Sequence, residues 1–254
     1  MLLVTNSCAA LCLSAAALLS ISIFTLINDY EQIEYEDSLC IFRAHVLFIS
    51  YAALNYSYLL QSSYRYAIVV YPTYLFFQSI RTQIILICII WICAITYPFA
   101  FDFNGEIIYN VNNQICMLQF HISFSLFYAI AFAYTIPILF IILLYFKLVR
   151  YVKQMNKRVV IVNTLYRARQ QLQMVQRVVI LVMILFVNGF PYVFFIILTL
   201  FGREPKYYLR IPYIFINISM VLVTIALYRF TDPLKESIKK NLRRRTNIVT
   251  AGLT

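Results

Sequence analysis

The chain is poor in glycine and in charged residues. Only 4 of its 254 residues are Gly, and it has neither an internal repeat nor a Gly- or Ser-rich linker, so a single domain is expected. Charged residues make up 12% of the sequence and hydrophobic residues 63%, which is more apolar surface than one soluble core can bury. This composition excludes an ordinary soluble domain and predicts a membrane protein.

Six stretches contain no Asp, Glu, Lys or Arg and are long enough for a membrane span, which requires about 17 to 25 residues. They are 3–27, 44–64, 84–101, 122–146, 178–201 and 211–228. A charge at the centre of a span costs about 2.5 to 3.5 kcal/mol on insertion scales, so six such windows in a row are not expected by chance. We therefore predict an all-α membrane protein whose six-helix transmembrane bundle occupies residues 1–230.

Charge is distributed asymmetrically between the loops. The loop 29–39 contains acidic residues and no Lys or Arg, whereas the segment 146–178 contains only basic charges. The side of the membrane that holds this segment carries most of the 21 Lys and Arg residues, so the positive-inside rule makes it cytoplasmic. Both termini are then expected to be cytoplasmic. The lipid bilayer accounts for the basic charge, and without a soluble basic domain nucleic acid is not expected as a partner.

Cysteine positions provide a constraint on the outer side. Four of the six cysteines lie within predicted spans: Cys8, Cys12, Cys88 and Cys93. Cys40, at the outer start of the second span, and Cys116, in the loop 102–121, face an oxidising compartment, which makes them the natural disulfide pair. The alternative is two free thiols. A bridge would hold the outer loop across the mouth of the second helix.

Residues for catalysis or metal binding are not grouped in this sequence. His45 and His121 are isolated, and neither a metal-ligand cluster nor a carboxylate pair within a span is found. We therefore expect no enzyme activity, metal or cofactor. The spans also lack the paired charges that usually line an ion path, which argues against a transporter.

The last residues, 231–254, predict a short amphipathic helix and a basic tail. Asp232 is placed to cap the helix and Pro233 to occupy its first position. The apolar residues that follow fall on one helical face: Leu234, Ile238 and Leu242. Lys and Arg occupy the remaining positions, so this helix is expected to lie on the inner leaflet.

Eight landmarks then occur in a recognisable order on these spans and loops. They are Cys40, Arg65 within Tyr64-Arg65-Tyr66, Trp91, Cys116, Pro137, Tyr145, Pro191 and Tyr228. Their order and sides resemble those of a rhodopsin-like (class A) G-protein-coupled receptor from which the first of seven helices is absent. The resemblance covers nearly the whole chain and implies that the six spans correspond to the second to seventh helices.

The resemblance implies a receptor in the plasma membrane. An extracellular ligand would activate it, and it would couple to heterotrimeric G proteins. Coupling would take place in a cytoplasmic cleft around Arg65. The residues implied in coupling and switching are Tyr64, Arg65, Tyr66, Pro72, Tyr145, Pro191 and Tyr228. Because six helices leave one flank of the bundle uncovered, a second copy or another partner is a further expectation.

The sequence departs from the family pattern at several switch positions. Tyr64 stands where the family has an acid, so the usual ion pair with Arg65 cannot form. The tryptophan two residues before Pro191 is replaced by Gly189, and the first span has no acid to bind sodium. A physical basis for bending remains, because Pro137 and Pro191 each remove a backbone hydrogen bond from a helix. The alternative for each proline is a static kink.

The sequence limits the chemical class of the ligand only by excluding certain classes. Leu47 lies where an amine receptor would place an acid, and the last span has no lysine for a retinal Schiff base. The candidate pocket residues are aromatic or neutral: Tyr51, Asn188, Tyr192, Phe195 and Asn217. An uncharged ligand is expected, although the same residues could serve helix packing. The alternative function is a non-signalling membrane protein, either a degenerate receptor or a transporter or channel subunit.

Overall fold

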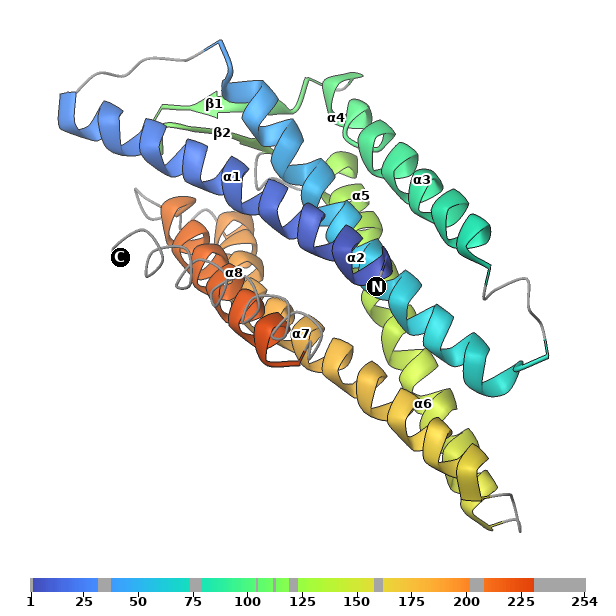
Figure 1. Ribbon diagram of the computed structural model, residues 1–254. Coiled ribbons are helices and arrows are strands. Elements are labelled where there is room, and N and C mark those ends of the chain that lie inside the picture. The colour runs from blue at the N-terminus through green and yellow to red at the C-terminus, as the bar shows by residue number, and fades with distance from the viewer. Residues whose placement is uncertain are drawn as a thin grey trace, which may run out of the picture.

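The computed structural model describes residues 2–31, 38–73, 79–103, 105–111, 113–118, 123–157, 162–201 and 208–230, so the predicted helix at 231–254 lies outside the described residues. These residues form an elongated bundle of long helices (Figure 1). The first half contains α1 (Leu2–Glu31), α2 (Cys40–Val70), α3 (Ile80–Thr96), the short α4 (Phe99–Phe103) and the strands β1 (Ile107–Asn110) and β2 (Ile115–Leu118). The second half contains α5 (Phe124–Ile130), the π-helical turn η2 (Ala131–Thr135), α6 (Ile136–Lys157), α7 (Val162–Leu200) and α8 (Arg210–Phe230).

Each of the six predicted spans coincides largely with helix. Four helical stretches are long and apolar enough to cross a membrane: Leu2–Glu31, Ile80–Phe101, Phe124–Met155 and Ala168–Thr199. The apolar part of α8, Arg210–Ala226, is shorter. The prediction is therefore confirmed for four spans, while crossing by 44–64 and by 211–228 stays a prediction.

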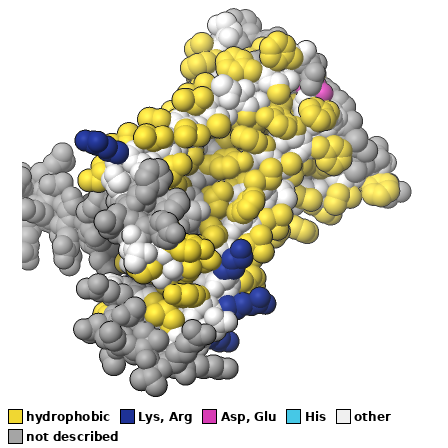
Figure 2. Space-filling view, turned by 90° about the vertical axis from the view of Figure 1, so that its right-hand side faces the viewer, with side chains coloured by type: hydrophobic (Ala, Val, Ile, Leu, Met, Phe, Trp, Pro, Cys, Tyr) yellow, Lys and Arg dark blue, Asp and Glu magenta, His cyan; other side chains and the backbone are white. Residues whose placement is uncertain are grey.

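The outside of the bundle is largely apolar. Exposed isoleucines follow one another along α3: Ile84, Ile85, Ile89, Ile92 and Ile95. Figure 2 shows a face on which hydrophobic side chains predominate and few charged side chains are seen among those coloured. A surface of this kind is stable against lipid and would be unstable in water, which agrees with a membrane protein.

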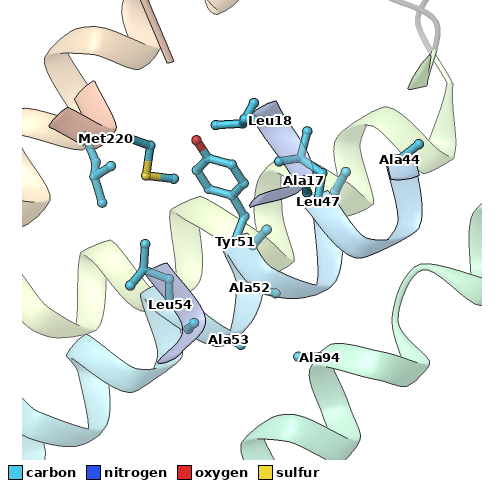
Figure 3. Close-up of a cluster of buried hydrophobic side chains, with 14 of the residues drawn as sticks. Ala17, Leu18, Ala44, Leu47, Tyr51, Ala52, Ala53, Leu54, Ala94 and Met220 are labelled. Carbon is cyan, nitrogen blue, oxygen red and sulfur yellow. The ribbon is translucent and has the colours of Figure 1, made fainter. Parts of the chain in front are cut away.

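The central helix of the bundle is α2. It packs against α1, α3, α6, α7, η2 and both strands. Ala52, Ala53, Leu54 and Tyr58 have no exposed surface, and the two alanines let neighbouring backbones approach closely (Figure 3). Because α2 faces other helices more than lipid, it can carry polar side chains at a lower cost than its neighbours.

Polar side chains join α1, α2 and α3. The Asn6 amide donates to Ser57 Oγ at 2.6 Å, and the Trp91 indole N–H donates to Asn6 Oδ1 at 2.8 Å. The Gln61 amide donates to Ser7 Oγ at 2.6 Å. In a bilayer such bonds hold helices together where burial from water provides no driving force, so Trp91 has a structural partner as well as its place in the sequence pattern.

The basic segment 146–178 is helical at both ends. α7 contains 39 residues, which at about 1.5 Å per residue is roughly 58 Å and exceeds the roughly 30 Å core of a bilayer. The continuous stretch Phe124–Met155 of α5, η2 and α6 contains 32 residues, so both it and α7 are long enough to extend beyond the membrane. A second apolar cluster holds them against α2: Val69, Leu148, Val152, Ala168 and Val175.

The loop 102–121 contains a β-hairpin, which the sequence pattern did not predict. β1 pairs antiparallel with β2, and Tyr109 lies opposite Cys116. All four residues of β2 are buried, as its apolar sequence from Ile115 to Leu118 requires. Cys40 and Cys116 form a disulfide, which confirms the predicted pair and attaches β2 to the first residue of α2.

Arg210 fixes the turn of the hairpin to two helices. Its guanidinium donates to both carboxylate oxygens of Asp29, at 2.7 and 3.0 Å, and its Nε donates to the carbonyl oxygen of Asn113 at 3.2 Å. The backbone N–H of Leu209 donates to Asn113 Oδ1 at 3.3 Å. One arginine thus links the end of α1, the hairpin turn and the start of α8.

Candidate coupling site and switch elements

Arg65 lies in the C-terminal half of α2 and contacts α7. Its Nη1 donates a 3.0 Å hydrogen bond to Oε1 of Gln171, and its Cζ lies 5.8 Å from the centroid of the Tyr64 ring. The side chain is partly buried, so it is not simply extended to the headgroup level. Gln171 was not among the predicted site residues, because a glutamine among basic residues matches no motif.

Two of the predicted coupling tyrosines pack against the same apolar cluster. Tyr66 of α2 and Tyr145 of α6 both pack against the cluster that contains Val69 and Leu148. The Tyr66 ring also lies edge-on to Tyr71, with 6.4 Å between centroids. The structure therefore brings together residues from α2, α6 and α7 around the C-terminal half of α2.

The remaining coupling residues are less fully described. α2 ends at Val70, and Tyr71 takes a more extended backbone (φ −125°, ψ 60°), as expected for a residue before proline, here Pro72. α8 reaches Tyr228, but the side chain of Tyr228 lies outside what the structure describes. Its role in coupling stays a prediction.

A cavity of about 260 Å³ lies beside the tyrosines that flank Arg65. Its lining includes Tyr64 and Tyr66 of α2, Leu3 of α1, and Gln83 and Leu86 of α3. The lining is almost entirely apolar. The side chains on either side of Arg65 therefore have space to reorient.

Pro137 gives α6 a modified first turn. In an ordinary α-helix residue 137 would donate its N–H to the carbonyl of Ala133, and proline has no N–H to donate. The Asn55 amide of α2 donates to that carbonyl oxygen at 2.8 Å, and the chain just before Pro137 is a π-turn in which the N–H of Ile136 reaches Ala131. A neighbouring helix thus satisfies the freed carbonyl, as a bilayer requires.

Pro191 lies in the interior of α7, as the pattern predicted. A methyl group added at Gly189 would meet no heavy atom within 4 Å. Close packing therefore does not require glycine there. Its presence beside Pro191 is better explained by the backbone freedom that glycine adds to a proline kink.

Several predicted ligand residues lie in the main core. Tyr51 and Phe195 are buried members of the core cluster, and Tyr192 packs against it. Tyr51 stacks on Tyr134 of η2 with 6.2 Å between ring centroids, and Figure 3 shows its hydroxyl group on the side of Leu18 and Met220. The site is lined by neutral aromatic groups.

The two candidate asparagines add little to this site. Asn217 donates to the carbonyl oxygen of Tyr213 within its own helix at 3.0 Å. The Asn188 side chain is not among those described. In the described part of the chain no group of three or more His, Cys, Asp or Glu residues is arranged to hold a metal ion. Ligand binding by these residues stays a prediction.

Comparison with known proteins bears on the whole bundle. A family model described as 7 transmembrane receptor (rhodopsin family) matches residues 5–235. The match extends from the first turn of α1 to just beyond α8. No curated protein matches the chain.

Proposed function

The chain belongs to the rhodopsin family of seven-transmembrane receptors, and from this premise we propose that it activates heterotrimeric G proteins when an extracellular ligand binds. This is a family of receptors and not of enzymes. In the proposed arrangement the six helices take the places of the second to seventh helices of the family. The protein would lie in the plasma membrane with both termini in the cytoplasm.

The observation that carries this proposal is the contact between Arg65 and Gln171. It joins the inner part of α2 to α7 through one hydrogen bond to a neutral amide, at 3.0 Å. A hydrogen bond of this kind breaks at a modest cost in free energy, while the apolar cluster around Val69 and Leu148 keeps the helices packed. Separation of α2 and α7 would expose the guanidinium to a G-protein helix. In a bundle with two states, the contact would therefore stabilise the resting state.

The hinges support the same mechanism. Pro137 and Pro191 weaken α6 and α7 at positions from which a small bend would displace their long inner ends. A ligand that binds one arrangement of the core better than the other would shift the population of the two states. The aromatic, uncharged surroundings of Tyr51 favour a neutral ligand.

Nucleotide exchange on a purified heterotrimeric G protein tests the proposal, with the chain in lipid nanodiscs. We expect measurable exchange by the unchanged chain and its loss with Arg65→Ala, because the guanidinium is the group that is uncovered. Arg81→Ala is the matched control, since Arg81 is exposed at the start of α3. Equal exchange by Arg65→Ala and the unchanged chain, or none by either, would refute the proposal.

A second candidate is a non-signalling membrane protein, either a degenerate receptor or a subunit of a transporter or channel. It is favoured by the missing acid before Arg65, where Tyr64 stands, and by the glycine that replaces tryptophan before Pro191. Absence of exchange with every G protein would select it.

A further inference from the structure

A groove on the outside of the bundle belongs to neither candidate site. Its volume is about 370 Å³, which is within the range of small-molecule sites. Apart from Ser20 and one arginine, all its lining residues are apolar: Ala16, Leu19, Ile23, Phe24 and Ile27 of α1, with Arg43 of α2. The residues of α1 follow one another in steps of three and four, which places them on one face of the helix. The groove therefore runs lengthwise along α1.

This face of α1 is turned away from the core. Ala17 and Leu18 are buried in the core cluster (Figure 3), whereas Leu19, Ile23 and Ile27 are exposed. In a membrane, exposed apolar residues of a spanning helix contact the hydrocarbon chains of lipids. An occupant of the groove therefore has to be soluble in lipid.

The dimensions of the groove suit one alkyl chain. From Ala16 to Ile27 the helix advances eleven residues, or roughly 16 Å, which is about half of the roughly 30 Å hydrocarbon core of a bilayer. The groove thus has the length of a chain in one leaflet. It is narrow for a transmembrane helix, whose diameter with side chains is about 10 to 12 Å. A single chain therefore fits better than a helix of a second copy or of another protein.

Arg43 determines the chemistry at the end of the groove nearest the C-terminus of α1. Its Cζ lies 4.8 Å from the centroid of the Phe24 ring, so a cation–π contact holds the guanidinium over the lining. A guanidinium has five N–H donors in a planar fork, and two of them match the two oxygens of a carboxylate. The apolar groove is thus joined to a group that binds carboxylates, whatever other contacts Arg43 makes.

Two acidic residues at the end of α1 leave this position available to an anion. Asp29 is two residues beyond Ile27, or about 200° around the helix, and it pairs with Arg210 at 2.7 Å. Glu31 is exposed and lies seven residues, or about 10 Å, beyond Phe24. This distance exceeds the Debye length of about 8 Å at physiological salt, so repulsion from Glu31 is weak.

We propose that this groove binds a long-chain fatty carboxylate, with the carboxylate on Arg43 and the alkyl chain along α1 towards Ala16. A fatty carboxylate has one negative charge and one chain, which match one guanidinium and one narrow groove. A phospholipid has two chains, of which the groove would accept only one. The alternative is that Arg43 only stacks on Phe24 and extends to the membrane surface. Binding in this groove does not depend on coupling to a G protein.

Photolabelling of the whole chain in phosphatidylcholine nanodiscs tests the proposal. The probe is a fatty acid with a diazirine in its chain, used at mildly alkaline pH so that the carboxyl group is ionised, and labelled peptides are identified by mass spectrometry. We expect label on α1 that excess palmitate displaces. A fatty alcohol with the same diazirine chain should label α1 much less. Equal labelling by acid and alcohol, or equal displacement by palmitate and phosphatidylglycerol, would overturn the proposal.

Substitution of Arg43 tests the role of its charge. Arg43→Gln should weaken palmitate binding by about tenfold or more, because it removes a charge-assisted pair. Arg43→Lys keeps the charge and should retain most of the affinity, which separates loss of charge from loss of fold. Arg81→Gln is the matched control, since Arg81 is an exposed arginine at the start of α3. Unchanged affinity in Arg43→Gln, or equal losses with Gln and Lys at this position, would overturn the proposal.

Substitution of Ile23 tests the position of the chain. Ile23→Trp places a large side chain in the groove and should weaken palmitate binding several-fold. Ile89→Trp is the matched control, because Ile89 of α3 is 48% exposed and Ile23 is 49% exposed, but only Ile23 lines the groove. Equal effects of the two substitutions would show that the chain does not lie along α1, and the proposal would fail.

Discussion

The guanidinium of Arg65 donates a 3.0 Å hydrogen bond to the side-chain oxygen of Gln171, and this contact joins the C-terminal part of α2 to α7. The acceptor is an amide, which attracts a guanidinium less strongly than a carboxylate does. With Tyr64 in place of an acid, the same arginine has a neutral neighbour on its own helix as well. The polar part of this contact thus consists of one charge and one dipole, and the apolar cluster around Val69 packs the same helices together.

Changing Gln171 should alter basal nucleotide exchange in both directions. Gln171→Ala removes the acceptor and should raise basal exchange, whereas Gln171→Glu supplies a charged acceptor and should lower it. A difference of about 1 to 1.5 kcal/mol between the closed states corresponds to roughly five- to tenfold in the population of the open state. Gln170→Ala is the control, because Gln170 is an exposed neighbour. Equal basal rates of nucleotide exchange with Gln171→Ala and Gln170→Ala would show that the contact between Arg65 and Gln171 does not restrain activation.

Tyr64→Asp should lower basal exchange as well. The Tyr64 ring centroid lies 5.8 Å from Cζ of Arg65, so a carboxylate on this residue would lie within range of the guanidinium. The charged pair would favour the state in which Arg65 is retained. Tyr64→Asn supplies a similar side chain without charge and should have a smaller effect. An unchanged or higher rate with Tyr64→Asp would show that the missing acid does not set basal activity.

The sequence predicted features that depend on composition and local chain geometry. Long apolar runs require a membrane, and Pro137 and Pro191 act on their own helices whatever their neighbours. The pairing of Cys40 with Cys116 followed from the side of the membrane on which each lies. These inferences use rules that hold for any helix in lipid, so they did not need the tertiary structure.

Features that depend on contacts between distant segments could not be predicted in the same way. Gln171 lies among polar and basic residues, and only the crossing of α2 and α7 brings it to Arg65. The β-hairpin is short, and its apolar strand from Ile115 to Leu118 has no periodicity that distinguishes it from a loop.

The hydrogen bond between Asn55 and Ala133 should contribute most to the stability of the protein when Pro137 is present. Asn55→Ala leaves the Ala133 carbonyl without its donor and should destabilise the protein by about 1 to 3 kcal/mol. In a Pro137→Ala background the restored N–H of residue 137 can donate to the Ala133 carbonyl. Asn55→Ala should therefore destabilise that protein less. Thermal unfolding of the four proteins in one detergent measures the coupling. Equal costs in both backgrounds would show that Asn55 does not compensate for the proline.

Loss of the disulfide should destabilise the outer end of the bundle. Cys40 and Cys116 are separated by 76 residues, and closing a loop of that length removes on the order of 4 kcal/mol of chain entropy from the unfolded state. Cys40→Ser, Cys116→Ser and the double substitution should therefore lower the melting temperature by similar amounts. Cys88→Ser is the control, because Cys88 is a free and exposed cysteine of α3. A single substitution with no effect would indicate that the bridge does not form in the membrane.

Arg210 should contribute more than its ion pair with Asp29. The pair is partly exposed, with 23% of the Arg210 side chain and 42% of the Asp29 side chain accessible, so solvent screening limits its contribution to about 1 kcal/mol or less. Asp29→Asn should therefore lower stability only slightly. Arg210→Ala should lower it further, because it also removes the 3.2 Å bond from Nε to the carbonyl oxygen of Asn113 at the hairpin turn.

Salt separates the two contributions of Arg210. Raising the ionic strength should reduce the difference between the unchanged protein and Asp29→Asn, since it screens the ion pair. It should leave most of the further loss seen with Arg210→Ala, because the bond to Asn113 has a neutral acceptor and Asn113 is fully buried. If Asp29→Asn and Arg210→Ala lower the melting temperature equally at every salt concentration, the hairpin is not held by Arg210, and its position over the bundle depends on the disulfide and on burial of β2.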